Sequence, residues 1–120
     1  MKHNHTYRKL AVWQKSMDFV TKIYSKINLF PQEELYSLSS QIKRSAISIP
    51  SNIAEGYGRN GTKDYLRFLN ISISSLFELQ TQIEIAYNLK FLDKDSFEEL
   101  YDDSREIERM LSSFISKIKQ

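Results

Sequence analysis

Apolar residues recur at helical spacing through most of the chain. The first stretch carries an apolar stripe whose members lie alternately four and three residues apart: Trp13, Met17, Val20, Tyr24 and Ile27. Such a stripe covers one side of an α-helix, so the pattern predicts a helix over residues 10–28. Phe30 and Pro31 then turn the chain, because proline suits the first position of a following helix.

Residues 31–57 carry two stripes on different sides of a second predicted helix. The apolar stripe comprises Leu35, Leu38, Ile42, Ala46, Ile49 and Ile53. The polar stripe lies about 200° away and comprises Gln41, Ser45, Ser48, Asn52, Glu55 and Arg59. Pro50 falls in the middle of this helix, where its missing N–H removes a hydrogen bond to the carbonyl of Ala46 and predicts a kink.

Residues 62–90 form the most apolar of the predicted helices, with Thr62 as the expected N-cap. One side carries Tyr65, Leu69, Leu76, Leu79, Ile83 and Ala86, and other sides carry Leu66, Phe68, Ile73, Phe77 and Tyr87. A helix that is apolar on several sides is buried on several sides. One copy of a chain of 120 residues cannot enclose one of its own four helices, so the surplus apolar surface predicts a homo-oligomer.

Residues 95–119 complete the set. The run Asp95-Ser96-Phe97-Glu98 has the spacing of a capping box, with Asp95 as the expected cap. Long helices with short connections predict an all-α fold, an antiparallel up-and-down four-helix bundle with a kinked second helix. We expect one domain over 1–120, a flexible segment at 1–9, and helices near 10–28, 31–57, 62–90 and 95–119.

The composition narrows the possible chemistry. The chain has 3 glycines, 2 prolines and no cysteine, which favours helices and excludes a disulfide framework, a thiolate nucleophile and an iron–sulfur cluster. His3 and His5 are the only histidines and precede the first predicted helix, so neither a di-iron bundle nor a Ser-His-Asp site can form on the helices. We therefore expect no functional metal site, no cofactor and no enzymatic activity.

Two carboxylates lie within weakly charged segments and are the remaining candidates for acid–base work. These are Glu55 and Glu78, and we expect them to pair with Arg44 or Arg59 across helices or subunits. Acid–base hydrolysis would instead require two carboxylates that converge in a cleft.

The glycines follow the spacing of a dinucleotide-binding fingerprint, Gly56-x-Gly58-x-x-Gly61. That motif requires a strand before the glycines, whereas here a predicted helix precedes them. We therefore interpret the segment as a turn between helices. The remaining alternative is a phosphate contact at the start of the third helix, near Arg59, Lys63 and Arg67.

Charge is distributed unevenly along a chain whose net charge is only +2. Residues 1–26 carry +5, from one acid, Asp18, and six bases: Lys2, Arg8, Lys9, Lys15, Lys22 and Lys26. Residues 91–120 carry −3, from eight acids and five bases. This asymmetry indicates either an end that faces nucleic acid or two ends that pair across subunits. No apolar signal core or membrane-length run occurs, so we place the protein in the cytoplasm, without a membrane partner.

One run of residues resembles the signature of a known family. The run is Tyr36-x-Leu38-x-Ser40-Gln41-Ile42-Lys43-Arg44-x-Ala46-x-Ser48-Ile49-Pro50-Ser51-Asn52-Ile53-Ala54-Glu55-Gly56. It is similar to the bacterial 23S rRNA intervening-sequence proteins, also called four helix bundle proteins. Further matches extend the resemblance over about residues 7–118, and mild departures are Ser37, where glycine is common, and Gln80, where glutamate is common.

The resemblance implies an up-and-down helical bundle that assembles into a ring, commonly a pentamer. Many members are encoded inside insertions in bacterial 23S rRNA genes. A distant relative, the accessory protein of diversity-generating retroelements, is a basic ring that works with a reverse transcriptase and nucleic acid.

Together these observations predict a non-enzymatic homo-oligomer that binds rRNA or another nucleic acid through basic surface residues, with weak sequence specificity. The candidate contacts are Arg8, Lys9, Lys15, Lys43, Arg44, Arg59, Lys63 and Arg67. The candidates for a subunit contact or a central channel are Gln41, Arg44, Ser48, Asn52, Glu55, Phe68 and Phe77. The alternative is a protein–protein scaffold with no nucleic-acid role, which the small net charge favours.

Aromatic residues at helical spacing have two interpretations. Exposed rings could stack on nucleobases, whereas buried rings belong to the core. We expect core burial for Trp13, Tyr24, Tyr57, Phe68 and Phe77.

Overall fold

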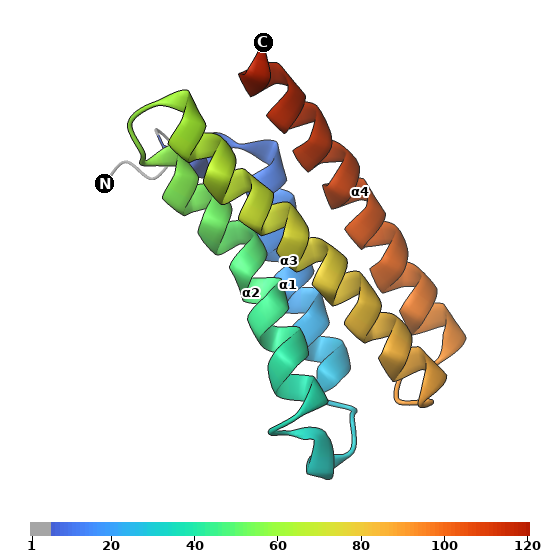
Figure 1. Cartoon of the computed structure of the whole chain (residues 1–120). Coiled ribbons are helices and arrows are strands. Elements are labelled where there is room, and N and C mark those ends of the chain that lie inside the picture. The colour runs from blue at the N-terminus through green and yellow to red at the C-terminus, as the bar shows by residue number, and fades with distance from the viewer. Residues whose placement is uncertain (1–5) are drawn as a thin grey trace.

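The computed structural model describes residues 6–120, which form a bundle of four α-helices (Figure 1). The helices are α1 (Ala11–Ile27), α2 (Leu38–Tyr57), α3 (Thr62–Asn88) and α4 (Lys94–Lys119), with two short 3-10 helices, η1 (Tyr7–Lys9) and η2 (Gln32–Glu34). This part of the chain contains no strand. The structure therefore confirms the all-α class and the four helices, while the ring and the kink stay predictions.

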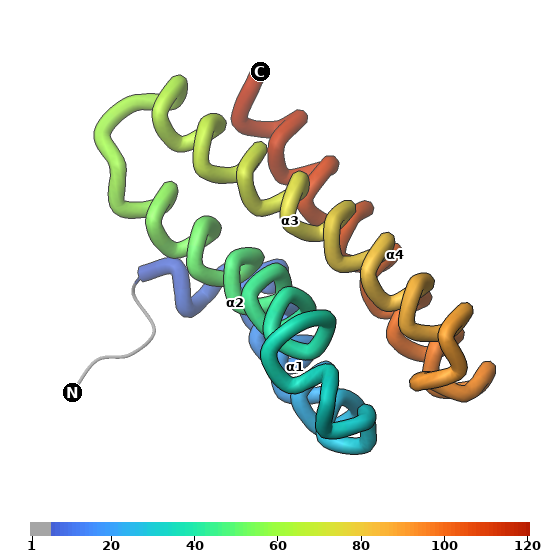
Figure 2. The backbone as a smooth tube through the Cα atoms, turned by 60° about the horizontal axis from the view of Figure 1, so that its bottom comes forward, coloured from blue at the N-terminus to red at the C-terminus, as the bar shows by residue number. Residues whose placement is uncertain are grey.

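The helices follow one another up and down, and α1 also packs against α4, so that the bundle closes. Figures 1 and 2 show that the start of α1, the α2–α3 turn and the end of α4 lie at one end of the bundle. The α1–α2 and α3–α4 connections lie at the other end. Each end of the bundle therefore brings together segments that are far apart in the sequence.

The core is apolar and draws on all four helices. In α3 the predicted stripe is buried, with Leu69, Leu76, Leu79, Ile83 and Ala86 no more than 1% exposed. The facing residues of α2 are also buried: Ile42, Ala46, Ile49 and Ile53. Helical periodicity thus identified the core side of both helices.

The α2 helix begins later than the sequence predicts. Pro31 is extended, with ψ 142°, and is followed by η2 instead of by α2. Ser37 has φ −126° and ψ −99°, outside the helical region, so no continuous helix joins Pro31 to Leu38. Phe30 is buried and lies against Phe91, with ring centroids 5.6 Å apart, so the chain turns to cover this end of the core.

Both predicted N-caps are wrong. The α4 helix is capped by Asp93, whose carboxylate accepts a hydrogen bond from the backbone N–H of Ser96 at 2.7 Å, and not by Asp95. This bond lowers the pKa of Asp93. The α3 helix follows Gly61, which has no side chain to cap it, and Thr62 is already helical.

The segment before α1 differs from the flexible terminus that the sequence predicts. Residues 7–9 form η1, and the Tyr7 ring lies edge-on to Trp13 with centroids 5.1 Å apart. The Gln14 side chain also donates to the carbonyl of Arg8 at 2.7 Å. His3 and His5 lie outside the described residues.

Pro50 lies inside a helix that continues to Tyr57. Neighbouring side chains bond to carbonyls beside it: Ser72 of α3 donates to the carbonyl of Ile49, and Asn52 donates to the carbonyl of Ser48 at 2.8 Å. The bond from Ser72 ties α2 to α3 at the level of the proline.

The end of α3 yields a first testable prediction. Lys90 has φ 68°, a left-handed conformation, while the N–H groups of Lys90 and Phe91 bond to the carbonyls of Tyr87 and Ala86. This Schellman arrangement favours glycine. We expect Lys90→Gly to stabilise the fold by about 1 kcal/mol, measured by urea denaturation. Asn88→Gly, two residues earlier inside the helix, should destabilise it, and a loss of stability in both variants would contradict the explanation.

Candidate nucleic-acid interface

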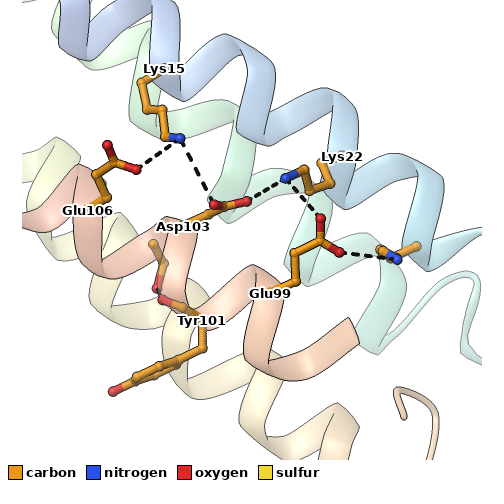
Figure 3. A network of polar contacts seen from close by, with 8 residues as sticks. Lys15, Lys22, Glu99, Tyr101, Asp103 and Glu106 are labelled. Atoms are coloured by element: carbon orange, nitrogen blue, oxygen red, sulfur yellow. Dashed lines mark hydrogen bonds and ion pairs between the residues drawn. The ribbon is translucent and has the colours of Figure 1, made fainter. Parts of the chain in front are cut away.

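Lysines of α1 pair with acids of α4 along one side of the bundle (Figure 3). Lys15 lies 3.0 Å from Glu106, Lys22 lies 2.7 Å from Asp103 and 3.1 Å from Glu99, and Lys26 lies 3.5 Å from Glu99. Hydrogen bonds to Asp103 and then Glu99 raise the pKa of Lys22, and the bond from Lys22 lowers the pKa of Glu99.

These pairs explain the uneven charge of the sequence. Three lysines of the basic first segment, Lys15, Lys22 and Lys26, pair with acids of the last segment within one chain. The sequence had left nucleic-acid contact and pairing across subunits as the alternatives. Lys15 is already engaged by this network and is a weaker candidate for a nucleic-acid contact than its charge alone indicates.

The total formal charge of the described residues is separated along the bundle axis. The half that contains the α2–α3 turn, residues 6–15, 50–72 and 106–120, is called the basic end here. It holds four acids (Glu55, Asp64, Glu106 and Glu108) and nine bases, a formal charge of +5: Arg8, Lys9, Lys15, Arg59, Lys63, Arg67, Arg109, Lys117 and Lys119. The other half, residues 16–49 and 73–105, holds seven bases and eleven acids, a formal charge of −4.

The structure brings six of the eight predicted nucleic-acid contacts to the basic end. They are Arg8, Lys9, Lys15, Arg59, Lys63 and Arg67. Lys43 and Arg44 lie in the other half, where the Lys43 ammonium sits 5.0 Å from the ring centroid of Tyr24. Arg8 stacks similarly over Trp13, at 5.4 Å.

Two arginines of the basic end are held in place beside the α2–α3 turn. The guanidinium groups of Arg59 and Arg67 lie 4.7 Å and 4.4 Å from the ring centroid of Phe68. Asp64 accepts from Arg67 at 2.9 Å, and Glu55 accepts from Arg59 at 2.9 Å. The pairing of Glu55 with Arg59 is therefore present, but within one helix and its C-terminal turn, not across helices or subunits as predicted. Glu78 instead accepts a hydrogen bond from Gln82 at 3.3 Å.

Sequence reasoning missed three bases of the basic end. Arg109, Lys117 and Lys119 belong to a C-terminal segment whose overall charge is negative, which concealed them. The available signal was finer, because residues 109–120 contain three bases and no acid. Arg109 and Lys117 line a groove between α1 and α4 together with Lys9.

The predicted subunit contacts of α2 make bonds within the chain. The hydroxyls of Ser48 and Ser75 lie 2.8 Å apart, and Asn52 donates to the Ser48 hydroxyl at 2.9 Å. The Ser48–Ser75 bond joins α2 to α3, and the bond from Asn52 holds the Ser48 side chain from within α2, which accounts for short polar side chains along this side. Gln41 and Arg44 are exposed, and Phe77 is 46% exposed.

Apolar surface remains on two separate sides of the bundle. A groove between α1 and α2 is lined mainly by apolar residues, among them Tyr7, Trp13, Met17, Val20, Ile47 and Pro50. Along α3, four large apolar side chains are 38–54% exposed: Ile71, Phe77, Ile85 and Leu89. The expectation of buried aromatics therefore fails for Phe77 and for Tyr57, which is 42% exposed.

Two polar side-chain atoms of α3 are buried without a hydrogen-bond partner among the described residues. They are the Tyr65 hydroxyl oxygen and the side-chain carbonyl oxygen of Gln82. Burial raises the pKa of Tyr65 to about 12, so this hydroxyl is protonated at neutral pH. Tyr65 packs between the rings of Tyr57 and Phe114, with centroids 6.3 Å and 5.9 Å away.

The glycine-rich segment forms the turn that the sequence predicts. It connects two helices, and Gly61 adopts a positive φ of 92°. Within residues 6–120, no cluster of three or more potential ligands is arranged to hold a metal ion. No helix in that range has the length and hydrophobicity needed to cross a membrane.

Comparisons with known proteins agree with the resemblance. The family model described as 23S rRNA-intervening sequence protein matches residues 8–113. A similar solved structure is that of a protein with unknown function from the S23 ribosomal protein family of Bacteroides thetaiotaomicron VPI-5482. The two chains are 28% identical, with a TM-score of 0.81 over 88% of this chain and 98% of that chain. No curated protein matches this chain.

Proposed function

Because the chain belongs to the 23S rRNA-intervening sequence protein family, we propose that it is a non-enzymatic, homo-oligomeric four-helix bundle that binds RNA or DNA through the basic end. We place this activity in the cytoplasm. The observation that supports it is the separation of charge, with +5 on one half of the bundle and −4 on the other.

A net charge of +2 is a poor guide to nucleic-acid binding when the charges are sorted in this way. Phosphates respond to the local concentration of cations, and binding releases the counterions that they had condensed. At the basic end, several cations have no acidic partner in the described structure: Arg8, Lys9, Lys63, Arg109, Lys117 and Lys119. These are the side chains that a phosphate can engage without displacing an ion pair.

Charge reversal at matched positions tests this proposal. Lys63 and Lys94 are both exposed, and each lies in the first turn of a helix, α3 at the basic end and α4 at the other end. Lys63→Glu should weaken binding to a structured rRNA fragment several-fold. It should also reduce the slope of log affinity against log salt concentration by about 1, the contribution of one phosphate contact. Lys94→Glu changes the net charge equally and should have little effect. Fluorescence anisotropy across a salt series measures both.

Equal weakening by the two variants would show that net charge alone matters and would contradict a role for the basic end. Absence of binding at low salt would favour the alternative function, a protein–protein scaffold. The exposed apolar surfaces are the observation that supports this second candidate.

Assembly into a ring is supported by the same two surfaces. They lie on different parts of the molecule, the α1–α2 groove and the outer side of α3. A contact between two unlike surfaces is head-to-tail, and such contacts form closed rings when the rotation between copies permits. The pentamer is the ring size that the family resemblance implies.

Ile47 offers a test of this assembly. It is 45% exposed and lines the α1–α2 groove, so a charge there should block the contact without disturbing the core. We expect Ile47→Glu to lower the native mass measured by light scattering by at least one subunit. Leu29→Glu, at a residue that is 81% exposed and outside the groove, should leave the mass unchanged. A monomeric unmodified protein would contradict the assembly itself.

A further inference from the structure

The groove between the start of α1 and the end of α4 combines an apolar floor with a basic rim. Its apolar lining comes from Leu10, Ala11, Val12, Met110 and Phe114. Its basic lining comes from Lys9, Arg109 and Lys117, and no acid lines it. The groove has a volume of about 520 Å³, which is within the range of small-ligand pockets.

The rim cations are not neutralised by the acids nearest to them in sequence. Glu106 pairs with Lys15 at 3.0 Å, and Glu108 pairs with Arg105 at 2.8 Å. Gln80 also donates to Glu108 at 3.0 Å. No acid precedes Asp18 in the sequence, so the segment before α1 brings no negative charge to the groove. The ligand that complements this rim is an anion.

The apolar floor favours an anion that carries a flat or apolar body. Phe114 provides an aromatic ring that packs against the ring of Tyr65, with centroids 5.9 Å apart and planes at 82°. A ring held in this way can support a stacked partner without first losing side-chain freedom. Aromatic or apolar platforms beside cations are the arrangement that binds bases of single-stranded nucleic acid.

We propose that this groove binds an unpaired nucleotide, with its base on the floor beside Phe114 and its phosphates at Lys9, Arg109 and Lys117. This inference rests on the proposed function and specifies its substrate class as single-stranded RNA or DNA. In a duplex the bases are stacked and paired, so only their phosphates reach the rim. In a single strand a base leaves the stack and covers the floor.

A comparison of three oligonucleotides tests the base contact separately from the phosphate contacts. The probes are a short single strand, the same strand annealed to its complement, and an abasic strand with the same number of phosphates. We expect the intact single strand to bind about tenfold more tightly than the abasic strand, because stacking of one base contributes an affinity of this order. The duplex should bind with the affinity of its phosphate contacts alone.

Two neighbouring serines provide matched variants. Ser113 lines the groove, whereas Ser112 is exposed on α4 outside it. Ser113→Phe should fill the groove and reduce the affinity for the intact strand to that of the abasic strand. Ser112→Phe should leave the preference unchanged. Lys117→Ala, compared with Lys119→Ala, gives a second test at the rim, because only Lys117 lines the groove.

The outcomes separate this inference from the function on which it rests. Equal binding of intact and abasic strands, with Ser113→Phe behaving like the unmodified protein, would overturn the base site while binding through the basic end remained. Binding of none of the probes at low salt would overturn both. A changed native mass of Ser113→Phe, with unchanged strand preference, would instead identify the groove as a subunit contact and contradict the base site.

Discussion

Leu76→Ala is expected to reduce the free energy of unfolding by about 3 kcal/mol, because it opens a cavity in a close-packed core. Leu76 is 0% exposed and lies in the middle of α3, whose buried residues extend from Leu69 to Ala86. Urea denaturation, monitored by circular dichroism, measures the loss.

The adjacent residue is the natural comparison. Phe77 is larger than Leu76 but 46% exposed, so Phe77→Ala should cost the fold of one chain much less. If α3 also contacts another copy, the effect of Phe77→Ala will depend on protein concentration, because subunit binding adds stability by mass action. A Phe77→Ala variant as damaging as Leu76→Ala at every concentration would contradict the assignment of the core side.

Gly56→Ala is expected to destabilise the fold by about 2 kcal/mol, because α2 and α3 approach each other too closely there for a side chain. A Cβ atom on Gly56 would lie 2.9 Å from both Cβ of Phe68 and Cδ1 of Tyr65, and 3.2 Å from the Tyr65 carbonyl oxygen. The first and third of these atoms belong to or adjoin the α3 backbone, so the helices themselves must separate.

Gly58→Ala is the matched control two residues later. A Cβ atom at Gly58 meets only the Glu55 carbonyl oxygen, at 3.7 Å, and its φ of −81° suits any residue. This change should be neutral or slightly stabilising, because alanine restricts the unfolded chain. Equal loss of stability in both variants would show that the turn itself, and not the helix approach, limits substitution. Thermal unfolding of both variants decides the matter.

Periodicity predicted the parts of the fold that depend on burial. The stripes of α2 and α3 placed those helices, and buried residues such as Ile42 and Leu79 fell on the expected sides. The stripe predicted for α1 placed the helix but not its buried side. That side carries the adjacent row Val12, Ser16, Phe19, Ile23 and Ile27, whereas Met17 is 43% exposed. Chain ends and caps were less predictable because neighbouring residues offer the same chemistry. Asp93 and Asp95 can both cap a helix, and only the path of the chain after Leu92 decides that Asp93 does so.

The candidate site was harder to predict than the core because it depends on the pairing of helices. Summing charge along the sequence identified a basic start and an acidic end, but not that Lys22 meets Asp103. Nor could spacing show that Lys9 and Lys117, at opposite ends of the chain, line one groove. The short polar side chains of the α2 polar stripe were noticed in the sequence, but not that Ser48 bonds to Ser75 of α3 while Asn52 bonds to Ser48 within α2.

The opposite signs of the two halves have a consequence for any cyclic arrangement whose axis runs along the helices. Every copy would then present its cationic half to the same rim, so like charges would crowd around that rim and resist closure. Added electrolyte screens this repulsion over distances of about 10 Å at 0.1 M. Higher ionic strength should therefore tighten the association of copies while it loosens their hold on a polyanion.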